Sequence, residues 1–289
     1  MPISPFLVVL AVLASGCAAP EAPEGTDGPT DSGTPPDLSV EPSLTAEEVA
    51  AEVEAVFASG FPDARAIQAA YLGLMGAGDD GCPGDATQLT GRVPVNGCSS
   101  EGGYFYLGVS AWIHTEEWDD VGNPRVTDSL DGDFEIDLPT GERFQAGGFA
   151  TYSHVGNELQ WVARNYVSGT WSFDGAPGPL GEGISAAVGV RVESAPETRS
   201  VEVTGATSSG EHAALFEDFR LDTLECAGNP TGAMRLRGSD GLWYELRFAD
   251  DCSGCGDVSF FDSTPLGVAC PSFAGVAERL ILDATVAAE

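Results

Sequence analysis

The feature that most limits how this chain can fold is a two-residue hydrophobic period, which begins at Gly102 and continues almost to the C-terminus. Successive side chains of a β-strand point to opposite faces, so such alternation is typical of strands with one buried face. Roughly ten or eleven runs of this kind follow one another, ending with RLILDATV, and turn residues but no crossover helices separate them. The pattern predicts a mainly β protein, with a large antiparallel sandwich or barrel at 79–289.

One run, YFYLGVSAWIH at 104–114, has two unlike faces. One face is wholly apolar and is expected to lie in the core: Phe105, Leu107, Val109, Ala111 and Ile113. The other face carries Tyr104, Tyr106, Trp112 and His114. If this aromatic strip is open to solvent, it is a candidate site for carbohydrate or peptide. The alternative is that the second predicted helix covers the strip, since aromatic side chains on strands mostly pack.

Two helices are predicted at 44–78, ahead of the strands. Thr45 and Glu48 match a capping box, in which each side chain accepts a hydrogen bond from the other residue's backbone N–H. Pro62 fits the first turn of the second helix. Apolar residues recur at helical spacing in both segments: Val49, Val53, Val56 and Phe57, then Ile67, Tyr71, Leu74 and Met75. We expect an αα hairpin with one face against the β domain.

The N-terminus has the features of an export signal. Residues 6–14 are an unbroken apolar run. It is too short to span a bilayer, which takes roughly 20 residues, but it suits the core of a signal peptide. Residues 18–43 are acidic and rich in Pro, Gly, Ser and Thr, a composition that cannot offset the entropy of ordering. The sequence thus predicts a signal at 1–16, a disordered acidic tether at 17–43 and a single globular domain at 44–289.

The stretch LVVLAVLASGC, in which small residues precede Cys17, resembles the lipobox of bacterial lipoproteins. In that family the cysteine is diacylglyceryl-modified, and the new amino terminus is acylated after cleavage. The resemblance implies a lipid anchor at Cys17, and Ala18 after it implies outer-membrane sorting. The alternative is ordinary cleavage that leaves Cys17 free or in a disulfide. With GDDGCPG, NGC and GGYFYLG further on, the chain also resembles cell-envelope lipoproteins of myxobacteria and their relatives.

With Cys17 set aside, an even number of cysteines remains: Cys82, Cys98, Cys226, Cys252, Cys255 and Cys270. In an oxidising compartment these predict three disulfides. Proximity in sequence favours Cys82–Cys98, with two bridges among the other four. The CSGC stretch at 252–255 also fits a redox motif or half of a zinc site. The strand-like run after it argues against the redox alternative, and export argues against zinc.

The chain has a net charge of −33, and all 12 basic residues are Arg. Nucleic-acid binding draws its affinity from clustered Lys and Arg, so this function class is excluded. Direct adsorption to an anionic lipid surface is excluded for the same reason. An acidic surface favours solubility, divalent cations or cationic partners.

No catalytic signature of the GxSxG, HExxH, P-loop or GxGxxG type is present. His114, His154 and His212 lie far apart in the sequence. The glycine-rich loop GDDGCPGD places Asp79, Asp80 and Asp85 together as a candidate Ca²⁺ site, although it lacks the full EF-hand pattern. No other cofactor is indicated.

These features favour a lipid-anchored, exported cell-envelope protein with a non-catalytic structural or ligand-binding role, and an enzyme is disfavoured. An envelope polymer or protein is the expected partner. Two alternatives stay open. One is a hydrolase of envelope or extracellular polymers, which needs convergent carboxylates or a His–acid pair. The other is a carrier that shelters an apolar ligand in a curved sheet.

Overall fold

The computed structural model describes residues 41–84, 91–210, 212–260 and 264–285, with the side chains of 91–96 excepted. The predicted signal, Cys17 and nearly all of the predicted tether lie outside these residues. The described residues from 42 onward form one compact unit.

In the part of the chain that the structure describes, twelve antiparallel strands form a single sheet whose spatial order is the sequence order, and this sheet is not closed into a barrel. The mainly β, antiparallel fold is thus confirmed. The strands are β1 (Gly91–Ser99), β2 (Phe105–Trp118), β3 (Pro124–Asp137), β4 (Arg143–Gly156), β5 (Trp161–Phe173), β6 (Ile184–Ala195), β7 (Thr198–Ser209), β8 (His212–Asp222), β9 (Pro230–Arg237), β10 (Trp243–Phe248), β11 (Gly256–Phe260) and β12 (Thr264–Ala269).

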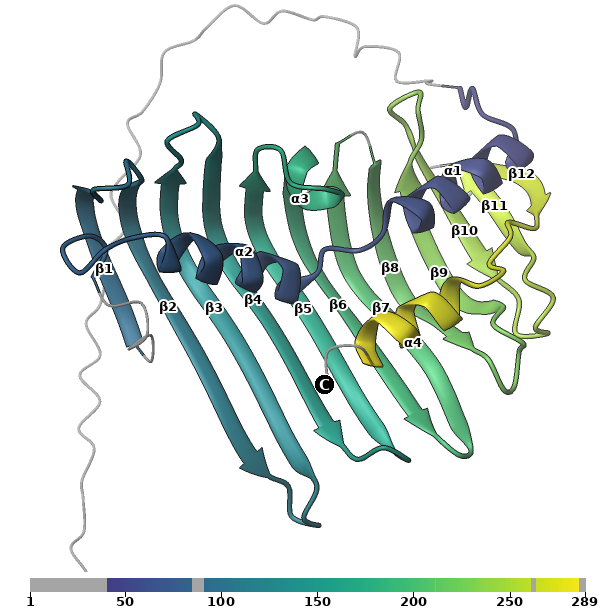
Figure 1. Cartoon of the computed structure of the whole chain (residues 1–289). Helices are drawn as coiled ribbons and strands as arrows, with labels where there is room; N and C mark the ends of the chain where they lie inside the picture. The colour runs from purple at the N-terminus through teal and green to yellow at the C-terminus, as the bar shows by residue number, and fades with distance from the viewer. Residues whose placement is uncertain (1–40, 85–90, 211, 261–263, 286–289) are drawn as a thin grey trace, which may run out of the picture. The chain divides into compact units, whose positions relative to one another are not determined.

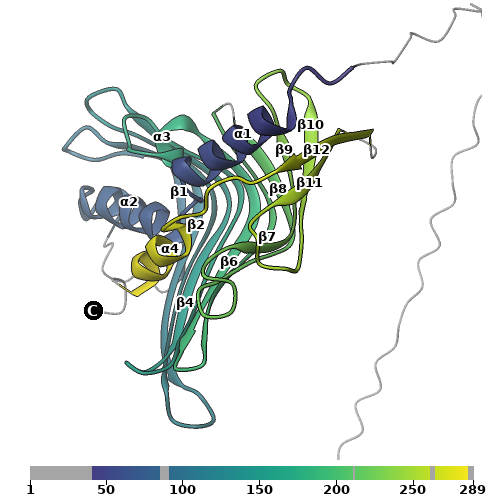
Figure 2. The ribbon, with the colours of Figure 1, turned by 90° about the vertical axis from the view of Figure 1, so that its right-hand side faces the viewer.

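Helices form the second layer. Figures 1 and 2 show α1 (Ala46–Ser59), α2 (Ala64–Gly76) and α4 (Val276–Thr285) on one side of the curved sheet. A single turn, α3 (Pro179–Glu182), lies between β5 and β6. α2 packs on β3 to β5, α4 on β6 and β7, and α1 on β8, β11 and β12. We call the covered side the helix face and the other side the open face.

The predicted helical pair is present, and Thr45 and Glu48 form the predicted capping box. α2 begins later than predicted, because Asp63 is its N-cap and Pro62 precedes it. The two helices do not fold back as a hairpin but follow each other end to end across the strands (Figure 1). In this arrangement each helix buries its apolar stripe on different strands of the wide sheet.

α2 is attached to the sheet by buried polar contacts. The amide of Gln68 donates to the carbonyls of Asp128 and Ala150, both at 3.0 Å. The hydroxyls of Tyr71 and Ser110 lie 2.8 Å apart. The Tyr106 hydroxyl donates to the carbonyl of Leu74 at 2.7 Å. These contacts fix the position of α2 along β2 to β4.

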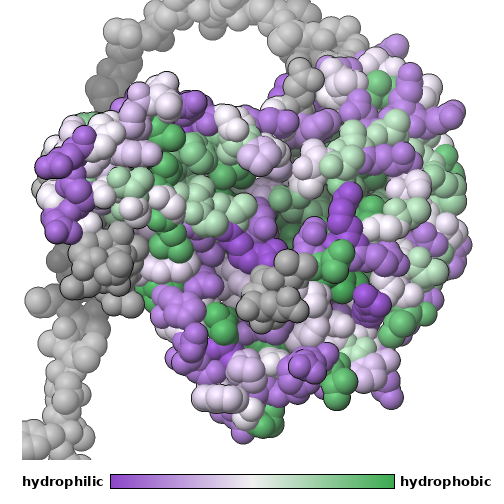
Figure 3. All heavy atoms as spheres, in the orientation of Figure 1, coloured by the Kyte–Doolittle hydropathy of each residue, from purple (hydrophilic) through white to green (hydrophobic). Residues whose placement is uncertain are grey.

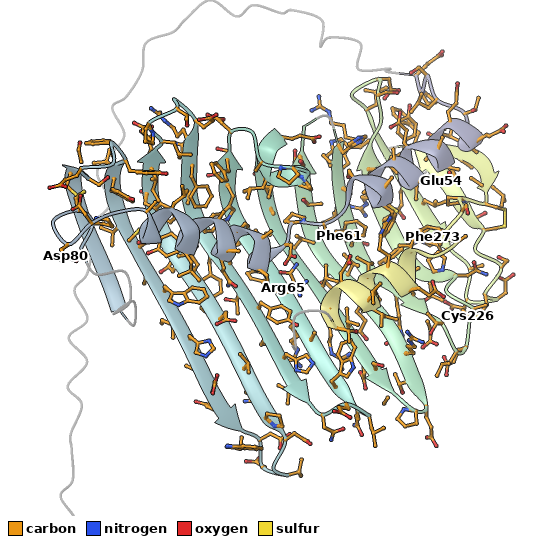
Figure 4. The ribbon with its side chains drawn as sticks, in the orientation of Figure 1. Glu54, Phe61, Arg65, Asp80, Cys226 and Phe273 are labelled. Carbon is orange, nitrogen blue, oxygen red and sulfur yellow. A yellow bond between two sulfur atoms is a disulfide. The ribbon has the colours of Figure 1, made fainter. Side chains whose placement is uncertain are left out.

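α1 and α4 are held instead by aromatic packing. Phe57 of α1 is 2% exposed, and its ring contacts four others: Phe61, Phe216, Phe219 and Phe273. Figure 4 shows Phe61 at the junction of α1 and α2, and Phe273 just ahead of α4. The aromatic cluster joins both helices to β8 and β10 through Phe219 and Phe248.

Two expectations about the strands are wrong. RLILDATV was expected to be a strand, but its residues 279–285 belong to α4, and Val286 lies outside the described residues. The residues buried there recur at helical spacing: Val276, Ala277, Ile281 and Ala284. The apolar face of 104–114 was expected in the core, yet Leu107, Val109 and Ile113 are 46%, 41% and 48% exposed on the open face. The cause is α2, which covers the opposite face of β2.

The predicted disulfides are present as Cys82–Cys98, Cys226–Cys252 and Cys255–Cys270. The first joins the loop after α2 to β1, and the other two lie around β9 to β12. Three disulfides indicate an oxidising, exported environment. Within the part of the chain that the structure describes, none of the helices is both long and apolar enough to cross a bilayer.

Candidate functional site

The helix face has an incompletely covered region over β4 to β6. A cleft with a volume of about 150 Å³ lies there, between the turn that joins α1 to α2 and the C-terminal half of α4. Figure 3 shows a shadowed hollow between the helices on this face, with hydrophobic side chains bordered by hydrophilic ones. The cleft lies between α2, which packs on β3 to β5, and α4, which packs on β6 and β7.

The floor of the cleft is mainly apolar, with the polar side chain of Asn165 between Tyr152 and Val190. It is formed by alternate residues of three neighbouring strands: Tyr152, Ala163, Val190 and Val192. These side chains are all at least nine-tenths buried. Phe61 and Leu280 close the sides, from the turn after α1 and from α4. An apolar group entering the cleft would exchange water for hydrocarbon contacts on several sides.

The rim of the cleft is charged but balanced. Arg65 lies over the Tyr152 ring, 4.7 Å from the ring centre, and pairs with Asp63 at 3.3 Å. Arg279 donates to the carbonyl of Phe57 at 2.6 Å, which ties α4 to the end of α1. Asp283 completes the rim. Two guanidinium groups and two carboxylates therefore surround a mainly apolar floor, and Figure 4 shows Arg65 at this position.

Asn165 sets the geometry of the cleft. Its side-chain oxygen accepts from the backbone N–H of Ala64 at 2.8 Å, and its amide donates to the carbonyl of Pro62 at 2.7 Å. Both bonds hold the turn between α1 and α2 against β5. Sequence reasoning missed this residue. The sequence does contain a signal for it: Asn165 is a polar side chain on the otherwise apolar face of the predicted strand WVARNYV.

The predicted aromatic strip lies on the helix face. Tyr106 is 1% exposed beneath α2. Tyr104 stacks on Tyr106 with ring centres 6.4 Å apart, and both Tyr104 and Trp112 pack against the core. Only His114 of the four is exposed. The strip is therefore mostly covered, and it does not form the open carbohydrate or peptide surface that was considered.

His114 faces two carboxylates. Its Nδ1 lies 2.6 Å from Asp128 Oδ1, and its Nε2 lies 3.2 Å from Glu116 Oε1. These hydrogen bonds, the one with Asp128 first, raise the pKa of His114 above its usual range. Protonation at both nitrogens is what two carboxylate acceptors require. His154 lies two strands from His114 and stacks on Trp161, and burial lowers the pKa of His154.

The acidic loop has a structural use for one of its carboxylates. Asp79 accepts backbone hydrogen bonds from Glu101, Gly81 and Cys82, at 2.6, 2.9 and 2.9 Å, and the bond from Glu101 is the main cause of its lowered pKa. Asp80 is exposed, at the β1 end of the sheet (Figure 4), and Asp85 lies outside the described residues. Among the residues that are described, no three His, Cys, Asp or Glu side chains are grouped so as to hold a metal.

Comparisons of the chain with protein-family models, with curated proteins and with solved structures find no match.

Proposed function

We propose that this chain is an exported ligand-binding protein and that the cleft between α2 and α4 takes the apolar part of its ligand. The observation that carries the proposal is the combination of a mainly apolar floor with a charged, balanced rim over β4 to β6, between α2 and α4. Ligand sites typically combine apolar walls with a few polar groups that fix orientation.

The volume limits the ligand. A dry cavity of about 150 Å³ holds a benzene-sized molecule, whereas pockets for whole drug-sized ligands are roughly 300–1,000 Å³. The cleft therefore suits a single ring or a short acyl segment, with the remainder of the ligand on the charged rim. This proposal corresponds to the apolar-ligand carrier considered from the sequence, except that the cleft shelters only one apolar group of the ligand and not the whole molecule.

The proposal is tested with 1-anilinonaphthalene-8-sulfonate, which fluoresces when it leaves water; its single phenyl ring fits the cleft, and its naphthalenesulfonate group remains at the charged rim. We expect saturable binding to the folded full chain. Ala284→Phe places a ring in the cleft and should weaken binding at least tenfold. Leu282→Phe is the matched control, because Leu282 is 62% exposed and does not line the cleft. Equal binding by the two variants would contradict the proposal.

We further propose that Cys17 carries a lipid anchor, that 18–43 tethers the domain, and that the mature protein lies at the outer membrane, with an envelope polymer or protein as partner. The lipobox resemblance and the exported disulfides support this. The intact mass of membrane-extracted protein tests it. A mass that begins at Cys17 with acyl chains added is expected, and an unmodified Cys17 would contradict the anchor.

A hydrolase is the second candidate, because the His114–Asp128 pair provides the His–acid element that it needs. Glu116 occupies the other ring nitrogen, however, and among the described residues no hydroxyl or thiol hydrogen-bonds to this imidazole. A catalytic His–acid pair needs a nucleophile or an activated water at that nitrogen. The binding role is therefore better supported.

A further inference from the structure

The open face of the sheet carries a second hollow, on the side opposite the cleft. Its volume is about 250 Å³, and its lining comes from β5, β6 and β7. Tyr166, Gly189 and Thr204 lie in one row across these strands. Arg164, Arg191 and Glu202 lie in the next row. These six residues belong to the solvent-facing sets of their strands, and Asn165 and Val190, which also line the hollow, lie between them along β5 and β6.

The row with Tyr166 offers an aromatic surface. Gly189 lies directly opposite Tyr166, and a Cβ at this glycine would come within 3.6 Å of the tyrosine ring. The ring thus lies against the sheet and is 41% exposed. Phe149 of β4 is 37% exposed, with its ring centre 6.4 Å from that of Tyr166. Two neighbouring rings on this face are therefore open to solvent.

The row with Arg164 contains a guanidinium that has no ion pair among the described residues. Arg164 and Arg191 lie directly opposite each other, an arrangement of like charges that destabilises a sheet. Arg191 is compensated by Glu193 at 2.5 Å and Glu202 at 3.1 Å. Among the described carboxylates, none lies within ion-pair distance of Arg164. In a chain of net charge −33, this guanidinium is left available for an external anion.

We propose that this hollow binds an acidic saccharide, with a sugar ring against Tyr166 and Phe149 and a sugar carboxylate on Arg164. A guanidinium matches a carboxylate with two parallel hydrogen bonds. The exposed rings supply a flat apolar surface. At its edge, the Thr204 hydroxyl and the Glu202 carboxylate can form hydrogen bonds with the hydroxyl groups of the sugar. Repulsion from distant acids of the protein is screened beyond about 8 Å at physiological ionic strength, so it weakens a short uronic acid only slightly.

The test is calorimetric titration of the full chain with trigalacturonic acid at physiological ionic strength, beside uncharged maltotriose. We expect trigalacturonic acid to bind at least tenfold more tightly than maltotriose. Arg164→Gln should weaken binding about tenfold or more, since one charge-assisted contact is lost. Tyr166→Ala should weaken the binding of trigalacturonic acid as well. Tyr166→Phe keeps the ring, so this variant should bind like the wild-type chain.

Arg247→Gln is the matched control. Arg247 is on the open face at β10, is 61% exposed and pairs with Glu245, so its loss changes the net charge equally but not the hollow. Equal weakening by Arg164→Gln and Arg247→Gln would show bulk electrostatics and overturn the proposal. Equal binding of the two sugars, or none by the wild-type chain, would overturn it too. Ala284→Phe should leave this binding unchanged, which separates the hollow from the cleft.

Discussion

The two ends of the sheet are stabilised in different ways. Beneath α2, the strands β2 to β5 are 13 or 14 residues long, and polar side chains attach the helix. At the other end of the sheet, where α1 packs on β11 and β12, the strands β9 to β12 are five to eight residues long. There the aromatic cluster and two disulfides supply the stability. Long ladders fix their own register through many backbone hydrogen bonds, whereas short strands depend on packing and covalent links.

The largest expected effect comes from the aromatic cluster. Phe57→Ala should lower the free energy of unfolding by about 3–5 kcal/mol, because a buried ring is lost and a cavity is left. Denaturant titration measures it. Leu224→Ala, at a position 55% exposed in the same half, is the control and should change stability by about 0.5 kcal/mol or less. A small change in the free energy of unfolding for Phe57→Ala would contradict the view that the aromatic cluster stabilises this end of the sheet.

Removal of the Cys226–Cys252 disulfide is the next largest effect. The double variant Cys226→Ala, Cys252→Ala should lose about 3 kcal/mol, the value expected for a loop of this order of length. Hydrogen exchange should accelerate in β9 to β11 before it does in β2 to β5. If exchange accelerates equally in both regions, the two ends unfold as one cooperative unit, and the distinction between them does not extend to stability.

At the α2 end, Gln68→Leu should cost about 1–3 kcal/mol. The substitution keeps the buried volume but leaves the carbonyls of Asp128 and Ala150 without their donor. Gln145→Leu, on the open face, is the matched control and should be nearly neutral. Thermal unfolding of both variants measures the difference. An equal Tm for the two would mean that the polar contacts contribute nothing to the attachment of α2.

The smallest effect concerns pH. The folded state raises the pKa of His114, so its contribution is complete below the unfolded value of about 6.5 and is lost as pH rises through the folded value. The lowered pKa of His154 acts in the opposite sense, because stability falls as pH drops below about 6.5. The stability difference between wild-type protein and His114→Asn should therefore shrink as pH rises from 6 to 8, and a constant difference would contradict this.

Local features of the sequence were enough to predict much of the fold. Alternation predicted an antiparallel β fold, because the period of a strand is a property of its own backbone. Thr45 and Glu48 predicted the start of α1, since a cap involves residues only three apart. Proximity predicted Cys82–Cys98. The strand prediction for 279–286 was wrong, because a short run of apolar residues fits both a strand and a helix.

The tertiary structure alone decided which face of each strand is inside. Alternation divides β2 into two faces, but the buried one is whichever face another element covers. α2 covers the side of Tyr106 and Ser110, and so the apolar side of Leu107 and Ile113 is exposed. The cleft and the hollow arise in the same way. The cleft combines strands and helices that are distant in sequence, and only their packing brings these residues together. The hollow lies on three consecutive strands, and it is open because the helices cover the other face of the sheet (Figure 1).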